Sequence, residues 1–88
     1  MNKDSSATIH LRMYGRRECH LCEDMREGLL SLAPELDFEL DTIDIDSDPE
    51  LESQFGTKVP VLMHGNHEIC HYFLDLKALQ MYFSQSPE

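Results

Sequence analysis

The spacing of apolar residues in the first third of the chain predicts a strand followed by a helix. From Thr8 to Tyr14, apolar and polar side chains alternate with the two-residue period of a β-strand. From His20 onward the period changes, and apolar residues recur every three or four positions, as on one face of a helix. Pro34 is expected to end this helix, because the residue before a proline avoids the helical region.

The middle of the chain predicts a second strand and a short helix. Residues 38–46 form the strand, and a slip in their alternation between Leu40 and Ile43 predicts a bulge or a strand start near there. Residues 47–50 have the features of a helix start: a capping residue, a proline at the first helical position and a carboxylate near the positive helix end. The helix is expected to end before Gly56, which suits the left-handed conformation that often follows a helix.

The last third of the chain predicts a β-hairpin and a final helix. Residues 59–63 form a strand with proline near its beginning, and the glycine and asparagine at 65–66 favour a tight turn. Residues 67–73 form the returning strand, and Asp75 is placed to cap the last helix. The apolar residues expected to share one face of that helix are Leu76, Leu79 and Phe83.

These elements predict an α/β fold in the order β-α-β-α-β-β-α. The first two strands are joined by a helix of more than ten residues, which makes them parallel, with a right-handed crossover. The last two strands form an antiparallel hairpin, so we expect a four-stranded mixed sheet with helices on both faces. The chain divides into a flexible N-terminus (1–7), a single domain (8–84) and a C-terminal tail (85–88).

The charge of the chain is concentrated in one segment, and it excludes some partners. The net charge of the 88 residues is −10, and residues 34–56 carry nine acidic and no basic side chains. Such a chain is a poor partner for phosphate backbones and for anionic lipid surfaces, so we expect neither nucleic-acid nor membrane binding. The acidic segment 35–52 is interpreted either as a solvated face or as a docking surface for a basic partner.

The cysteine count and the first residues indicate a reducing compartment. The three cysteines include one CxxC pair, which does not match the disulfide framework of a small secreted protein. Residues 1–6 are polar and lack the apolar segment of a secretory signal, and no apolar run is long enough to span a membrane. We therefore expect a cytoplasmic monomer.

Cys19 and Cys22 lie where the loop after the first strand enters the first helix. The first turn of a helix exposes unpaired N–H groups and the positive end of the dipole, which lower the pKa of a thiol there below its free value of about 8.5. Because the thiolate is the nucleophile of disulfide exchange, Cys19 is the expected attacking residue. Cys22 follows on the same helix face, more buried, and close enough to close a disulfide. The pair therefore predicts a thiol–disulfide oxidoreductase.

The charged neighbours of the pair act in opposite directions. Arg16 and Arg17 favour the anion of Cys19, whereas nearby carboxylates oppose it, and His20 favours it only when protonated. We expect the helix N-terminus to dominate, because carboxylates that face solvent are screened. The three opposing carboxylates belong to Glu18, Glu23 and Asp24.

Two other functions fit parts of the sequence. The CxxC pair is also found in zinc sites and in iron–sulfur proteins, where further ligands complete the metal centre. A redox-inactive binding protein that uses the acidic segment 35–52 is the other alternative. The candidates for the second half of a zinc site are His64, His67, Cys70 and His71, although Cys70 is also interpreted as a small buried hydrophobe.

Three short segments carry a resemblance to a known family. They are Tyr14-Gly15 after the first strand, the run Cys19-His20-Leu21-Cys22, and Val59-Pro60-Val61 before the hairpin. In this order they resemble the glutaredoxin branch of the thioredoxin superfamily, and more narrowly a group of small bacterial glutaredoxin-like proteins. The resemblance extends over residues 8–83 and implies a thioredoxin-like fold.

The resemblance also implies roles for individual residues. Cys19 would be the attacking cysteine and Cys22 the resolving one. Pro60 would be cis and lie beside the cysteines, and the backbone of Val59 would pair with a bound peptide or glutathione. Tyr14 would lie near the cysteines, where it either contacts the substrate or serves as a packing aromatic.

The sequence departs from typical glutaredoxins at two places that concern glutathione. His20-Leu21 replaces Pro-Tyr between the cysteines, and residues 71–75 lack the glycine pair that precedes an acidic residue, with Asp75 as a partial substitute. We expect no resident metal or cofactor, a disulfide-containing protein or glutathione as partner, and glutathione as the candidate co-substrate. The cations available for its carboxylates, unless they are ordinary surface charges, are Arg16, Arg17 and Lys58.

Overall fold

A computed structural model of the protein describes residues 9–85 and has the predicted order of elements. The expected flexible N-terminus (1–7) lies outside the described residues. So does the expected tail, apart from Gln85, which ends the last helix. Within residues 9–85, no helix is both long and apolar enough to cross a membrane. The elements are β1 (Ile9–Gly15), α2 (His20–Leu36), β2 (Phe38–Asp44), α3 (Pro49–Phe55), β3 (Val61–His64), β4 (His67–His71) and α4 (Leu76–Gln85).

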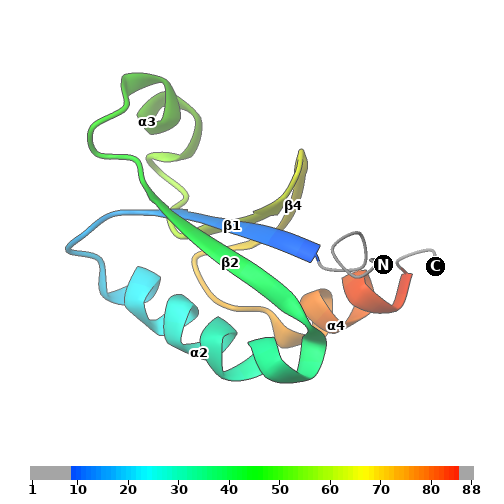
Figure 1. Cartoon of the computed structure of the whole chain (residues 1–88). Helices are drawn as coiled ribbons and strands as arrows, with labels where there is room; N and C mark the ends of the chain where they lie inside the picture. The colour runs from blue at the N-terminus through cyan, green and yellow to red at the C-terminus, as the bar shows by residue number, and fades with distance from the viewer. Residues whose placement is uncertain (1–8, 86–88) are drawn as a thin grey trace, which may run out of the picture.

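The strands form one mixed sheet in the order β2-β1-β3-β4. β1 and β2 are parallel, whereas β3 runs antiparallel to both β1 and β4. α2 and α4 cover one face of the sheet, and α3 lies beyond the other face (Figure 1). The predicted four-stranded α/β sheet with helices on both faces is therefore confirmed.

The main core lies between the sheet and helices α2 and α4. Alternate residues of β1 point into it, as the two-residue period predicted, and the buried residues of α2 follow the helical period. α4 adds Leu79, and Phe83 meets Phe38 edge to face with ring centroids 5.8 Å apart. The most deeply buried residues of this core include Leu11, Met13, Met25, Leu29, Leu62 and Leu79.

A smaller apolar contact holds α3 to the opposite face. Tyr14 of β1 stacks on Phe55 of α3 with ring centroids 4.4 Å apart. The strand partners of Tyr14 are Ile43 and Val61. The predicted bulge near Ile43 is wrong, because β1 and β2 pair without a break from Ile9 to Gly15. The apolar residues of β2 fall out of alternation because they cover both faces of the sheet. Leu40 packs against the main core, whereas Ile43 is paired with Tyr14 and points to the other face.

The predicted end of α2 is also wrong, and so is the conformation expected for Gly56, although α3 ends at Phe55 as predicted. α2 continues through Pro34 to Leu36, because a proline in the last turn removes only one hydrogen bond. The left-handed residue that closes α2 is Asp37, with φ of 62°, and its N–H donates to the carbonyl of Ala33. Gly56 after α3 has a right-handed φ of −55° instead.

The predicted cap of α4 is confirmed, but one residue of its predicted apolar face is exposed. The Oδ1 atom of Asp75 accepts a hydrogen bond from the N–H of Ala78 at 3.0 Å, which confirms the cap. Leu79 is fully buried, but Leu76 is 49% exposed. Leu76 stays exposed at the first turn of α4, where it borders an open hollow beside Phe73.

Neighbouring leucines in α2 test the boundary of the core. Leu29 has no exposed surface, whereas Leu30 is 45% exposed. We expect Leu29→Ala to lower the free energy of unfolding by about 3 kcal/mol, because it removes apolar contacts and leaves a cavity. Leu30→Ala should cost well under half of that. Urea denaturation of both variants measures the difference, and equal losses would contradict the described packing.

Candidate active site

Cys19 occupies the N-cap of α2, as the sequence predicted. Its backbone is extended, with φ of −140° and ψ of 107°, and its sulfur accepts a hydrogen bond from the N–H of Cys22 at 3.1 Å. The two sulfurs are joined in a disulfide, and the Cα atoms of the pair are 5.1 Å apart. The first turn of the helix thus directs a backbone donor at the sulfur of the first cysteine.

The two cysteines differ in exposure. Cys22 is 3% exposed and belongs to the core, whereas Cys19 is only half-buried. Gly15 at the end of β1 allows this close packing, since a Cβ atom there would lie 2.8 Å from the sulfur of Cys22. An incoming sulfur therefore reaches Cys19 more easily than Cys22.

The guanidinium of Arg16 is bound by acidic residues rather than by the cysteine pair. Its guanidinium contacts the carboxylates of Asp46 and Glu52 and donates to the carbonyl of Gly56. These contacts raise the pKa of Arg16 and lower that of Glu52, because each charge stabilises the other. Arg16 therefore ties the loop before Cys19 to α3.

The other charged neighbours of the pair face solvent. Arg17 has an 84% exposed side chain and lies 3.7 Å from Asp44. His20 and Asp24 lie 3.4 Å apart on the outside of α2. Water screens such charges strongly, so the backbone N–H of the helix is the group that acts directly on the Cys19 sulfur. A hollow of about 290 Å³ opens on the β2 side of Cys22, and both arginine and carboxylate side chains line it.

Pro60 lies at the cysteine end of the sheet. The Val59–Pro60 peptide is cis, as the family resemblance implied, and Pro60 is buried. The next residue, Val61, pairs with Tyr14, which directly precedes the glycine that contacts Cys22. Within the described part of the chain, neither the N–H nor the carbonyl of Val59 has a backbone hydrogen-bond partner. The polar backbone groups of Val59 are thus without a backbone partner at the end of the sheet where β1 leads into the cysteine loop.

Tyr72 is a site residue that the sequence analysis missed. β4 was expected to extend to Phe73, but it ends at His71, and Tyr72 adopts a left-handed φ of 68°. Its N–H donates to the carbonyl of Pro60, and its phenol donates to the carbonyl of Thr57, each at 2.8 Å. Two hydrogen bonds from one residue therefore hold the segment that contains Val59, and they offset the strain of a conformation unusual for tyrosine.

Lys58 is held by an acidic residue of the hairpin. Its Nζ atom lies 2.6 Å from Oε1 of Glu68, whose Oε2 lies 2.6 Å from Nδ1 of His71. The pKa of Glu68 is lowered, chiefly by the hydrogen bond from Lys58 and further by the one it accepts from His71. The structure therefore places a compact charged cluster beside Val59.

The residues considered for a second half of a zinc site are not gathered at the cysteine pair. His64 hydrogen-bonds the phenol of Tyr82, on which His67 stacks, and His71 contacts Glu68. Cys70 of β4 is buried in the main core, and burial raises the pKa of its thiol. Among residues 9–85, no three or more ligating side chains are grouped so as to hold a metal ion.

The contact between Gly15 and Cys22 generates a test of the site. We expect Gly15→Ala to lower the free energy of unfolding of the oxidised protein by about 1–3 kcal/mol, because the new methyl overlaps the Cys22 sulfur. The loss should be smaller in the reduced protein, where that sulfur is no longer bonded to Cys19. Thermal unfolding in both redox states measures this, and an equal loss would show that the cost arises elsewhere.

Comparison with known proteins agrees with this geometry. Residues 10–84 match the model of the Glutaredoxin-like domain (DUF836). An uncharacterized protein of Mycobacterium tuberculosis and one of Mycobacterium bovis are each 30% identical over 76 residues, with 81% of this chain and 78% of the relative covered.

Solved structures show the same fold. A protein of Nitrosomonas europaea has 41% identity and a TM-score of 0.77, with 84% of this chain and 89% of that chain covered. A protein of X. campestris has 30% identity and a TM-score of 0.67, with 88% and 99% covered. Thioredoxin 1 of Thermosipho africanus shares the fold, with a TM-score of 0.60 and 16% identity. The match covers 86% of this chain and 96% of that chain. The chain thus has a thioredoxin-like fold and belongs to the glutaredoxin-like domain family.

Proposed function

We propose that the protein is a thiol–disulfide oxidoreductase that reduces disulfides of other proteins through Cys19 and Cys22. The observation that carries the proposal is the Cys19 sulfur at the N-cap of α2, where it accepts the Cys22 N–H. The same donor and the helix dipole stabilise a thiolate at Cys19 once the pair is reduced.

The first step is an exchange at the exposed sulfur. The Cys19 thiolate attacks one sulfur of a substrate disulfide and forms a mixed disulfide with it. The substrate bond breaks, and the second substrate sulfur leaves as a thiolate that takes a proton from water. Cys19 performs this step because its sulfur is the more accessible of the two. Cys19 is only half-buried, whereas Cys22 is 3% exposed.

The second step releases the substrate. Cys22 loses its proton to water and attacks the Cys19 sulfur, so that the mixed disulfide breaks and the remaining substrate thiolate leaves. The substrate has then gained two electrons, and the protein has the Cys19–Cys22 disulfide seen in the structure. An external dithiol, or two molecules of glutathione, restores the reduced pair by the reverse exchange.

The surroundings of the pair favour a polypeptide substrate. The free backbone groups of Val59 allow an extended segment to add along the sheet, whatever its side chains. Beyond the Pro60–Tyr72 hydrogen bond, Tyr72 is 42% exposed and Phe73 is 65% exposed. Exposed apolar side chains of this size beside a binding backbone are typical of surfaces that contact other proteins.

The side chains that the sequence offered as partners for the charged groups of glutathione are largely engaged elsewhere. Asp75, the proposed substitute for the family's acidic residue, uses Oδ1 to cap α4. The charges of Arg16 and Lys58 are already paired with carboxylates. Arg17, the most exposed of the three cations proposed from the sequence, also lies 3.7 Å from the Asp44 carboxylate. We therefore propose that a dithiol reductant serves the protein better than glutathione does.

Cysteine variants test the function. Cys19→Ser should abolish the reduction of a protein disulfide, whereas Cys22→Ser should accumulate a mixed disulfide with the substrate. Cys70→Ser is the matched control, because its buried thiol has no part in the exchange, and it should keep the activity. The assay is run once with glutathione and its reductase and once with thioredoxin reductase. Full activity of Cys19→Ser in both runs would refute the proposal.

Alkylation of the reduced protein tests the order of reactivity. Below neutral pH, iodoacetamide should modify Cys19 first, because the helix N-terminus maintains its thiolate. Cys70 should react slowly, because its raised pKa leaves less thiolate at any given pH, and Cys22 should be shielded by burial. Mass spectrometry of timed samples gives the three rates. Equal and slow modification with the pH profile of a free thiol is the opposing result.

A further inference from the structure

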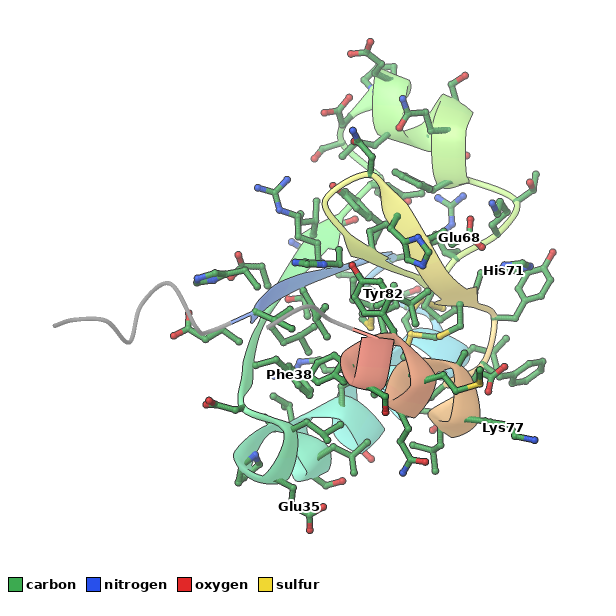
Figure 2. All side chains as sticks on the ribbon, turned by 90° about the vertical axis from the view of Figure 1, so that its right-hand side faces the viewer. Glu35, Phe38, Glu68, His71, Lys77 and Tyr82 are labelled. Atoms are coloured by element: carbon green, nitrogen blue, oxygen red, sulfur yellow. A yellow bond between two sulfur atoms is a disulfide. The ribbon has the colours of Figure 1, made fainter. Side chains whose placement is uncertain are left out.

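The β3–β4 hairpin contains an irregularity that redirects one side chain. Leu62 pairs with Cys70 and Met63 pairs with Glu68, so Ile69 has no partner across the ladder. In a regular strand, side chains three residues apart point to opposite faces. The extra residue brings Glu68 and His71 to the same side of β4, where Figure 2 shows them next to each other.

Both carboxylate oxygens of Glu68 have partners as a result. Oε1 lies 2.6 Å from the ammonium of Lys58, and Oε2 lies 2.6 Å from Nδ1 of His71. The three side chains are between 31% and 39% exposed, so water reaches the cluster but does not surround it. The pKa of Glu68 is lowered by these contacts, so its carboxylate carries its full charge at neutral pH.

The cluster borders the backbone that we assign to the substrate. Lys58 directly precedes Val59, and His71 directly precedes Tyr72. Because Tyr72 holds the carbonyls of Thr57 and Pro60, the position of Lys58 relative to the open backbone is fixed. A disulfide bound along Val59 therefore meets Lys58 as the neighbouring cation in the chain.

We propose that Glu68 determines the charge preference of the site. By neutralising Lys58, it removes that cation from the recognition of anionic disulfides and leaves recognition to the backbone and the exposed aromatic side chains. The inference rests on the proposed oxidoreductase function, since it concerns which disulfides the same site accepts. It identifies Glu68 as a specificity-determining residue against negatively charged substrates.

Two small disulfides of different charge provide the test. The reduced protein is mixed with dithiodiglycolate, which is anionic, or with bis(2-hydroxyethyl) disulfide, which is neutral, and kcat/KM is measured for each. Glu68→Gln should raise the ratio of the anionic to the neutral value about two- to fivefold at low salt, as expected for an exposed charge. The effect should shrink at high ionic strength, because salt screens it.

Control variants separate this effect from a change in net charge. Glu39→Gln removes an exposed carboxylate on β2 and should leave the ratio unchanged. Lys58→Gln should lower the ratio, because it leaves the Glu68 carboxylate unpaired. The double variant Lys58→Gln/Glu68→Gln should lose the gain of Glu68→Gln, and it should be no better with the anionic disulfide than the wild type.

The outcomes distinguish the two proposals. If the wild type reduces neither disulfide, the proposed function fails. If the wild type is active but Glu68→Gln leaves the ratio unchanged, or if the gain persists without Lys58, only the role of Glu68 is overturned. Should Glu68→Gln unfold, which circular dichroism detects, the fall in the ratio expected for Lys58→Gln decides the question alone.

Discussion

The contact between the first turn of α2 and the sulfur of Cys19 is the constraint on which the candidate site depends. A helix leaves its first N–H groups without internal partners, and a side chain at the N-cap accepts one of them. In this protein the acceptor is the Cys19 sulfur, and the donor is the N–H of Cys22. The position that starts the helix is therefore also the position where a thiolate is stabilised, and the second sulfur follows one turn later.

Contacts on both faces of the sheet hold the loop and the first turn of α2 in place. On one face, Gly15 lets β1 approach the sulfur of Cys22. On the other, Arg16 joins the next part of the loop to Asp46 and Glu52, near and within α3. Part of the acidic segment thus has a structural use, because it supplies the partners of an arginine that would otherwise stand free beside the disulfide.

Local pairing of charges gives the site its chemical character. Carboxylates hold both Arg16, which lies before Cys19 in the sequence, and Lys58, which lies before Val59. Little of their positive charge is therefore free for an anionic ligand. The backbone of Val59 and the exposed rings of Tyr72 and Phe73 remain. Recognition by backbone and apolar contact suits an extended polypeptide, in keeping with the proposed reduction of protein disulfides by a chain of net charge −10.

Local patterns in the sequence were sufficient for the order of elements, the mixed sheet, Cys19 at a helix start and the cap at Asp75. These features depend on hydrophobic period and on contacts within a few residues, which a sequence displays directly. The helix passing through Pro34, the left-handed Tyr72 and the pairing of Lys58 with Glu68 were decided by the tertiary structure. Each depends on packing, or on hydrogen bonds between segments that only folding brings together, and these compensate for what the local sequence disfavours.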